Sequence, residues 1–137
     1  MKIKKINHIG IATSNLEKTL KLYEEVFGLK STGIQDIPIQ MQRSAFISIG
    51  ESALEVMEPT DPQGPVGKFI GKHGEGLHHI SLEVDDVNAL SEELKKRDIK
   101  LMLPEAVNFA GIKINFVHPK SMVGVLIELI QEGGNKQ

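Results

Sequence analysis

The sequence contains no cysteine and no tryptophan, and it has only one tyrosine. Without cysteine there is no disulfide framework, no thiolate nucleophile and no cysteine-type zinc site. The 16 basic and 18 acidic residues leave a formal net charge of -2, and they form no long run of one sign. We therefore expect neither a nucleic-acid partner nor a membrane-surface partner.

Long apolar segments are also missing. No apolar run in the sequence is longer than residues 125–127, which Glu128 ends, so nothing in the sequence has the length of a bilayer span. The first five residues lack the apolar core of a signal peptide. These features predict a cytoplasmic protein.

The length of 137 residues suits one domain that buries a core without covalent staples. Two halves of about 60 residues would each be marginal alone. We therefore predict a single domain over residues 1–137, even though the sequence contains an internal repeat.

The repeat is marked by two histidines, His8 and His79, that each open a strand-like apolar segment. A helix-capping residue follows seven positions later in both cases, Asn15 in the first copy and Asp86 in the second. The sequence therefore predicts a duplication in which each copy contributes one histidine at an equivalent place.

Each copy is predicted to be a βαβββ module. In module 1, residues 3–58, a capping box at Ser14 and Glu17 begins a helix whose buried stripe is Leu16, Leu20, Tyr23 and Phe27, and Gly28 ends it. Residues 59–75 are predicted to be a linker with a short helical turn at 66–70. In module 2, residues 76–131, Asp85 or Asp86 caps a helix with Val87, Leu90 and Leu94 on its buried stripe.

The strands predicted for module 1 are 3–12, 30–37, 43–49 and 53–57, with a hairpin turn at 50–52, and those for module 2 are 77–84, 99–103, 112–118 and 123–130. The fold class predicted is α+β, with two tandem βαβββ modules forming a curved, cupped mixed β-sheet around a metal site.

The last strand of each module carries a glutamate, Glu55 or Glu128. Side chains alternate between the two faces of a strand, and in these strands apolar residues occupy both faces, so neither face is expected to be exposed to water. Burying a carboxylate is costly unless it is paired or binds a cation. His8 precedes Glu55 by 47 positions and His79 precedes Glu128 by 49, so both modules hold the same pair at nearly the same separation.

Two neutral imidazoles and two carboxylates balance the charge of a divalent ion, and this mixed donor set suits cobalt, nickel, manganese, iron or zinc without choosing among them. We therefore predict His8, Glu55, His79 and Glu128 as metal ligands. His78 points to the opposite face by alternation and is expected outside this set, and His73 is expected to be exposed.

These residues resemble the vicinal oxygen chelate superfamily, the glyoxalase and bleomycin-resistance fold, and within it the methylmalonyl-CoA epimerases. The resemblance covers most of residues 6–130 and is carried by the segments 8–12, 54–59, 65–69, 76–80 and 115–121, followed by 124–129. The His-Pro-Lys-Ser sequence at 118–121 and the Pro-Val-Gly-Lys-Phe sequence at 65–69 are the parts that point to the epimerases.

The resemblance implies the same four ligands, His8, Glu55, His79 and Glu128, and a divalent metal with cobalt favoured over nickel, manganese or zinc. It also implies an acyl-CoA substrate, a homodimer, and epimerisation at C2 of methylmalonyl-CoA through a metal-stabilised enolate. Epimerases of this type often carry glutamine where Glu55 stands, although glutamate also occurs.

Inversion at C2 is most simply done with one base on each face of a planar enolate. The resemblance implies Glu128 as one base, and Glu55 is the candidate for the second. An acid that some family members carry near the third strand is not evident, because Arg43 or Ser44 occupies that place. Substrate contacts are expected at Lys120, Ser121 and Gln40, for which a solvated loop position is the alternative interpretation.

Two other functions use the same fold. A lactoylglutathione lyase of the glyoxalase I type would act on a glutathione hemithioacetal with the same metal and bases. A non-enzymatic binding protein would sequester a small molecule without metal, but such binders depend on aromatic stacking, and the chain has few aromatic residues. An extradiol dioxygenase is disfavoured because Glu55 would add a fourth ligand to its two-histidine, one-carboxylate iron site.

Overall fold

The computed structural model describes residues 2–109 and 111–133. Their contacts divide the chain into two compact units, which are described one at a time. One unit runs from His8 to His78, and the other combines the residues before His8 with those after His78. The boundaries fall inside two strands, β1 (Ile3–Ala12) and β5 (Gly76–Val84). The single domain over residues 1–137 stays a prediction.

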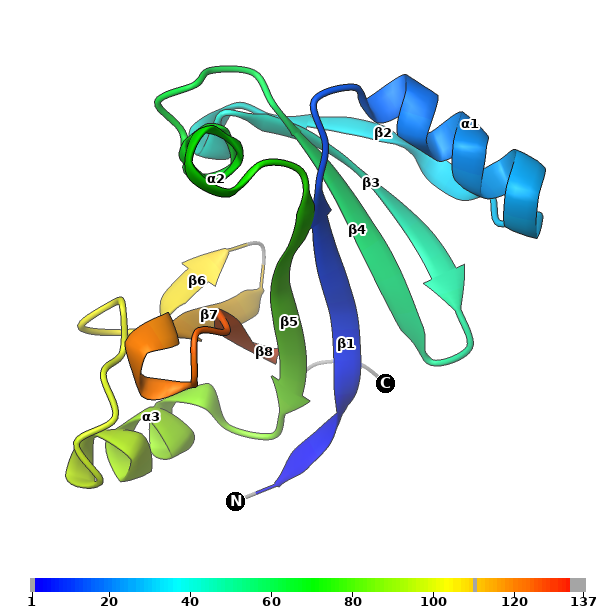
Figure 1. Cartoon of the computed structure of the whole chain (residues 1–137). Helices are drawn as coiled ribbons and strands as arrows, with labels where there is room; N and C mark the ends of the chain where they lie inside the picture. Colours follow the sequence, from blue (N-terminus) through cyan, green and yellow to red (C-terminus); the bar gives the residue numbers. More distant parts are fainter. Residues whose placement is uncertain (1, 110, 134–137) are drawn as a thin grey trace. The chain divides into compact units, whose positions relative to one another are not determined.

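The order of elements repeats along the chain (Figure 1). After β1, the first copy contains α1 (Leu16–Phe27), β2 (Ser31–Ile37), the short 3-10 helix η1 (Pro38–Gln40), β3 (Gln42–Ile49), β4 (Ser52–Pro59) and the additional helix α2 (Pro65–His73). After β5, the second contains α3 (Val87–Lys96), β6 (Val107–Phe109), β7 (Ile112–Val117), the 3-10 helix η2 (Pro119–Ser121) and β8 (Ile127–Gln131). The predicted α+β class and the two βαβββ modules are confirmed.

Both copies arrange their strands in the same way. The strand order is β2-β3-β4-β1 in the first and β5-β8-β7-β6 in the second. In each, the first strand runs parallel to the last, while the remaining neighbours are antiparallel. The strands of each copy are therefore mixed in direction, as predicted, because the helical connection that follows the first strand allows a parallel pair.

The first hydrophobic core lies between α1 and the strands β3 and β4. Leu16 is fully buried there against Ala45, Ile47 and Val56. The predicted capping box at Ser14 and Glu17 is wrong: the N-cap is Asn15, whose side chain accepts a hydrogen bond from the Lys18 N–H. Gly28 ends α1 in the left-handed conformation with φ 70°, as predicted.

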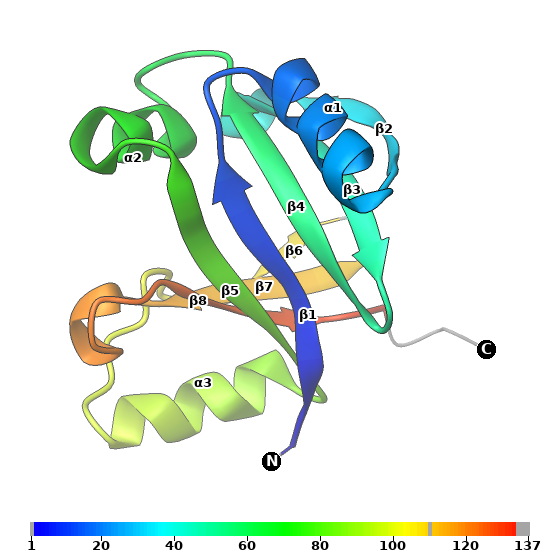
Figure 2. The same cartoon turned by 45° about the vertical axis from the view of Figure 1, so that its right-hand side comes forward.

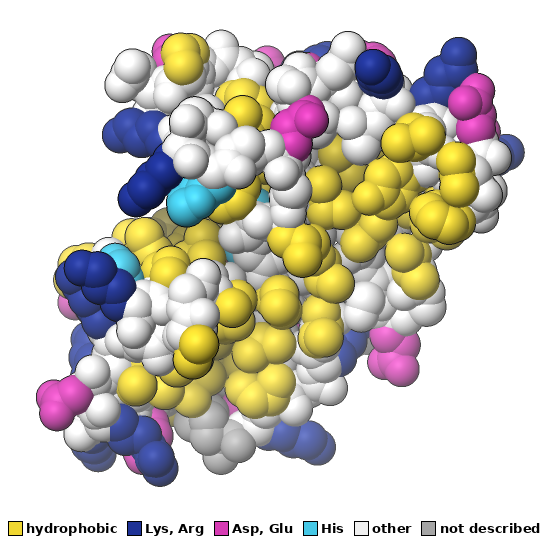
Figure 3. Space-filling view, viewed as in Figure 1, with side chains coloured by type: hydrophobic (Ala, Val, Ile, Leu, Met, Phe, Trp, Pro, Cys, Tyr) yellow, Lys and Arg dark blue, Asp and Glu magenta, His cyan; other side chains and the backbone are white. Residues whose placement is uncertain are grey.

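The buried stripe of α1 is shorter than predicted. Leu20 and Tyr23 pack against the core, but Phe27 is 67% exposed. Apolar side chains lie on the outer surface over α1 (Figure 3), and Leu22 and Val26 are exposed with Phe27. Phe27 is the last residue of the helix, and its ring contacts that of Tyr23 at a centroid distance of 6.2 Å.

The predicted linker contains a longer helix than expected. A turn at residues 66–70 was predicted, and α2 runs from Pro65 to His73. Val66 is buried with Ala12 and Met57, so this helix is part of the fold of its unit. Gly67 lets α2 approach the preceding loop, because a Cβ atom there would lie 2.6 Å from the Pro62 Cα atom.

The second core lies under α3, which packs on β7 and β8. Figure 2 shows α3 beside β8. Asp86 caps the helix by accepting a hydrogen bond from the Ala89 N–H at 3.0 Å. Val87 is fully buried with Val84, Val117 and Leu129, and the other members of the predicted stripe, Leu90 and Leu94, pack against this cluster.

The strands of the second copy differ from the prediction in three places. Residues 99–103 form no strand, and only Leu101 bridges to Val117. The Asn115 side chain binds the Leu103 backbone N–H and carbonyl instead, at 3.2 and 3.3 Å. The second strand of the module is β6 (Val107–Phe109), a segment for which the sequence predicts no strand. The last strand begins at Ile127 rather than 123, because Val123 and Gly124 turn the chain with φ values of 56° and 86°.

None of the helices within residues 2–109 and 111–133 combines the length and the apolar character needed to cross a bilayer.

We expect Val123→Gly to raise the free energy of unfolding by roughly 0.5–1 kcal/mol, because the left-handed penalty of an L-residue exceeds the entropic cost of glycine. Val123 is 98% exposed, so the substitution removes almost no packing. Urea unfolding measures the change. Val107→Gly, within strand β6, is the control and should lower the free energy of unfolding. A loss of stability in Val123→Gly would contradict the strain argument.

Glu75 lies between the end of α2 and the start of β5, and its side chain binds the two residues that follow β1. Its carboxylate accepts hydrogen bonds from the Ser14 N–H at 2.8 Å, the Ser14 hydroxyl at 2.7 Å and the Thr13 hydroxyl at 3.2 Å. These bonds, led by that of the Ser14 backbone, hold the pKa of Glu75 below its ordinary value of 4.5. The stabilisation is therefore fully present above the unfolded-state pKa and is lost as the pH falls through the lowered folded-state pKa.

We expect Glu75→Gln to lower the melting temperature most at pH 7, with the difference from the unmodified protein shrinking toward pH 3. Thermal unfolding at several pH values measures this. Glu24→Gln, on the exposed side of α1, is the control and should give a smaller difference at pH 7. A difference that stays constant over the whole pH range would show that the carboxylate charge has no part in the contact.

Candidate metal centre

The unit from His8 to His78 contains a buried histidine–glutamate pair. The His8 Nε2 atom lies 3.3 Å from Glu55 Oε1, and the two residues are 5% and 9% exposed. The parallel register of β1 and β4 sets Gly10 opposite Glu55, so His8, two residues before Gly10, lies on the same face as the carboxylate. The predicted pair is therefore formed by strand geometry.

The other unit contains the same pair. The His79 Nε2 atom lies 3.3 Å from Glu128 Oε1, and both residues are 7% exposed. The parallel register of β5 and β8 sets Ser81 opposite Glu128, and His79 again lies two residues before that position. Although the sequence separations are 47 and 49 positions, the histidine of each copy lies two residues before the position opposite its glutamate.

A phenylalanine completes each copy of this arrangement. Phe46 of β3 stands opposite Glu55 of β4, and Phe116 of β7 stands opposite Glu128 of β8. The ring of Phe46 meets that of His8 edge to face at a centroid distance of 5.7 Å. The sequence predictions missed both residues as neighbours of the pairs, although a phenylalanine on the strand before each glutamate was the available signal.

The chemistry of these donors fits a divalent metal. Each pair offers one imidazole nitrogen and one carboxylate, with the hydrocarbon of a phenylalanine on the adjoining strand. A buried carboxylate is costly without a partner, and metal ligation by histidine and carboxylate satisfies it. Glu55 and Glu128 are both buried, each beside a histidine, and the role of the four side chains as ligands stays a prediction.

The predicted substrate contacts lie on the two 3-10 helices. Gln40 is exposed at the end of η1, and Lys120 is exposed on η2. Ser121 is half-buried, and its hydroxyl oxygen accepts a hydrogen bond from the Lys100 N–H at 3.0 Å. Ser121 therefore has a structural partner, and all three roles toward substrate stay predictions.

Arg43 takes part in an ion-pair network. Its guanidinium donates hydrogen bonds to the carboxylates of Glu17 and Glu58. The hydrogen bond from Arg43 lowers the pKa of Glu17, and the bonds to Glu17 and then Glu58 raise the pKa of Arg43 further. Arg43 is thus a permanent cation in this network and does not act as a base.

Ser44, the other residue at that place, is fully buried and bonded to its neighbour on the same face. Its hydroxyl lies 2.7 Å from the Gln42 Nε2 atom, which donates to it. Gln42 is also buried, at 3% exposure. A hydroxyl without a nearby general base is a poor proton acceptor. Neither Arg43 nor Ser44 can therefore replace the carboxylic acid that some family members carry near the third strand.

The remaining histidines near α2 pack on one ring. The Phe69 ring contacts that of His73 at a centroid distance of 5.0 Å and that of His78 at 4.7 Å. His73 is exposed, as predicted. His78 is half-buried, and its ring packs against that of Phe69.

The chain belongs to the Glyoxalase/Bleomycin resistance protein/Dioxygenase superfamily, whose family model matches residues 7–116. Its relatives within the superfamily include several methylmalonyl-CoA epimerases. The mitochondrial methylmalonyl-CoA epimerase of Mus musculus is 32% identical over 95% of this chain and 74% of its own length. The ethylmalonyl-CoA/methylmalonyl-CoA epimerase of Cereibacter sphaeroides is 30% identical over 94% of this chain and 98% of its own.

Solved structures agree with this assignment. A variant of the Streptomyces coelicolor methylmalonyl-CoA epimerase in complex with 2-nitronate-propionyl-CoA has a TM-score of 0.90 and 31% identity, with 99% of both chains covered. A methylmalonyl-CoA epimerase in complex with methylmalonyl-CoA and an ammonium ion has the same TM-score of 0.90 and the same identity of 31%, again over 99% of both chains. The predicted superfamily and its glyoxalase-like fold are confirmed.

We expect Ser121→Ala to lower the free energy of unfolding by about 1 kcal/mol, because the Lys100 N–H loses its hydrogen-bond acceptor. Lys120→Ala, at the neighbouring exposed position, is the control and should change it by less than about 0.5 kcal/mol. Urea unfolding of the two variants measures the difference. Equal effects would show that the Ser121 hydroxyl contributes nothing to the fold.

Proposed function

We propose that the protein interconverts the two C2 epimers of methylmalonyl-CoA with the help of a divalent cation held by His8, Glu55, His79 and Glu128. The observation that carries this proposal is the buried histidine–glutamate pair, formed twice with the same strand register in a chain that is 30–32% identical to methylmalonyl-CoA epimerases over most of its length. A chance occurrence of one such pair is ordinary. Its repetition in the same register supports a shared role for the four side chains.

The four donors are two imidazole nitrogens and two carboxylates, which together neutralise a divalent ion. The family resemblance favours cobalt, and nickel, manganese and zinc accept the same donors. When bound, the cation supplies stabilisation of the negative charge that develops on the oxygen atoms of the substrate.

The proton transfers are assigned to the glutamates. The C2 proton of methylmalonyl-CoA lies between a thioester and a carboxylate. When a carboxylate of the protein removes this proton, the C–H bond electrons move into the thioester and give an enolate. A proton returned to the opposite face completes the inversion. Glu128 is the proposed base on one face and Glu55 on the other, since Arg43 and Ser44 are committed to other contacts.

The substrate contacts are proposed at Lys120, Ser121 and Gln40. The exposed ammonium group of Lys120 suits the substrate carboxylate or a phosphate of coenzyme A, both of which are anionic. Ser121 shares its hydroxyl with the Lys100 N–H, so its contact with substrate is a second hydrogen bond. Gln40 offers an amide from an exposed helix end.

Two further properties belong to the proposal. A homodimer is implied by the family resemblance. A cytoplasmic location is favoured by the sequence, whereas the relative from Mus musculus is named as mitochondrial. No contact with nucleic acid is expected from the balanced charge.

The second candidate function is that of a lactoylglutathione lyase. A lactoylglutathione lyase of Arabidopsis thaliana is 32% identical over 92% of this chain, but the chain spans only 44% of that protein. The epimerases are matched over most of their own length, which favours epimerisation. A non-enzymatic binding protein would not need four buried metal donors.

The decisive measurement is proton NMR of methylmalonyl-CoA in deuterated water with the cobalt-loaded protein. We expect the C2 proton signal to disappear by exchange, and Glu128→Gln to slow this exchange by about 100-fold or more, because the general base is lost. Glu105→Gln, at an exposed loop position, is the matched control and should exchange at the unmodified rate.

Chelation completes the test. Protein freed of metal should lose the exchange and regain it when cobalt is added, and His79→Ala should bind cobalt far more weakly than His73→Ala, which changes an exposed histidine. Full exchange after chelation, or an unaltered rate in Glu128→Gln, would refute the proposal. Conversion of the methylglyoxal–glutathione adduct without exchange of methylmalonyl-CoA would assign the lyase function instead.

A further inference from the structure

Ser81, in the middle of β5, is fully buried at 0% exposure, and its hydroxyl has no hydrogen-bond partner among the described residues. A buried hydroxyl without a partner destabilises the folded state, because it has lost water and gained nothing in return. Such a group calls for an explanation, and either a water molecule or a partner supplied in the functional state provides one.

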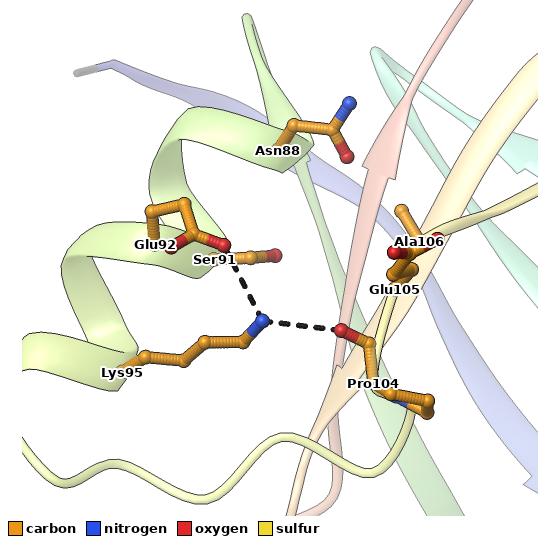
Figure 4. Close-up of a pocket in the computed structure, with 7 residues that line it drawn as sticks. All are labelled: Asn88, Ser91, Glu92, Lys95, Pro104, Glu105 and Ala106. Atoms are coloured by element: carbon orange, nitrogen blue, oxygen red, sulfur yellow. Dashed lines mark hydrogen bonds and ion pairs between the residues drawn. The ribbon is translucent and has the colours of Figure 1, made fainter.

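One other side chain in the described residues shares this property, the hydroxyl of Ser91 on α3. Figure 4 shows that Ser91 lies beside a hollow between α3 and the segment Pro104–Ala106. The Lys95 ammonium group crosses this hollow, at 3.3 Å from a Glu92 carboxylate oxygen and 3.1 Å from the Pro104 carbonyl oxygen. The hollow is open and polar, so water can serve as the partner of Ser91.

The surroundings of Ser81 are different. The register of β5 and β8 sets it directly opposite Glu128, and alternation along β5 sets it on the same face as His79. Leu82 and Val84, on the other face, pack into the core under α3. The Ser81 hydroxyl is thus on the face of the histidine–glutamate pair, one strand away from the Glu128 side chain.

The spacing of neighbouring strands lets the Ser81 hydroxyl reach the Glu128 carboxylate. Neighbouring strands lie about 4.8 Å apart. A serine side chain rotates among three staggered positions, and a carboxylate has a second oxygen when the first faces an imidazole. A change of side-chain rotamer is enough to bring a serine hydroxyl to a carboxylate on the adjoining strand.

We infer that Ser81 is a positioning residue: its hydroxyl donates a hydrogen bond to the Glu128 carboxylate when that carboxylate binds the cation. The inference rests on the proposed function, because it needs Glu128 as a ligand. Metal-binding carboxylates are themselves hydrogen-bonded, and that second bond fixes their orientation. The partner of the buried hydroxyl is then supplied by the metal-bound arrangement of Glu128.

The first copy offers no equivalent donor for Glu55. The residue opposite Glu55 is Gly10, which has no side chain to donate a hydrogen bond. The two otherwise matching pairs therefore differ at this one register position. Ser81 gives Glu128 an orienting contact that Glu55 does not receive from the equivalent place.

The test measures cobalt affinity by competition with a chelator, together with the thermal unfolding of the metal-free protein. We expect Ser81→Ala to bind cobalt about 10- to 100-fold more weakly. The metal-free Ser81→Ala protein should melt at the same temperature as the unmodified protein or higher, because a buried hydroxyl without a partner is removed. A merely structural hydroxyl would give the reverse pattern, a lower melting temperature with unchanged affinity.

Ser91→Ala is the matched control, since it removes the other buried hydroxyl of this kind from the same unit. Its cobalt affinity should stay within about twofold of the unmodified value, because α3 lies on the face away from His79. A double-mutant cycle adds the link to Glu128: in a Glu128→Ala background, Ser81→Ala should cause no further loss of affinity.

Unmodified affinity in Ser81→Ala, or an equal loss with and without Glu128, would overturn this inference alone. Failure of the unmodified protein to bind a divalent cation would overturn the proposed function and this inference with it. Cation binding by the unmodified protein thus distinguishes the two failures.

Discussion

The contact between a buried imidazole and a buried carboxylate is the constraint on which this molecule depends. A carboxylate withdrawn from water destabilises the fold unless a partner is held in place beside it. Here the partner is placed by the parallel pairing of the first and last strands of a module, which sets the histidine two residues before the position opposite the glutamate. A shift of one residue in that register would turn the glutamate toward the helix and leave it among leucine and valine side chains.

The same alternation separates stability from chemistry. In each unit one face of the strands packs under a helix, with clusters around Leu16 and Val56 or around Val87 and Leu129. The opposite face carries the histidine–glutamate pair and the phenylalanine of the adjoining strand. Because successive side chains point to opposite faces, one short strand can serve the core and the site at once.

The duplication is close in geometry but unequal in chemistry. The histidine, glutamate and phenylalanine recur at matching register positions, whereas Gly10 in one copy corresponds to Ser81 in the other. The additional helix α2 follows the first copy, where Val66 is buried with Ala12 and Met57, and up to residue 133 no helix follows β8 in the second. The two glutamates proposed as general bases therefore need not be equivalent. Inversion at a carbon centre requires two groups that act on opposite faces.

The sequence by itself determined the repeat, the α+β modules and the four candidate ligands, because their signals are local: apolar periodicity, helix caps and the recurrence of histidine and glutamate at similar spacing. Tertiary structure decided what local signals do not contain. The Ser14 hydroxyl donates a hydrogen bond to the distant Glu75 carboxylate instead of capping α1. The Asn115 side chain binds the backbone of Leu103, where the sequence predicts a strand. The pairing of strands decided which residue stands opposite each glutamate. Each of these depends on groups far apart in the chain, which only the folded backbone brings within hydrogen-bonding distance.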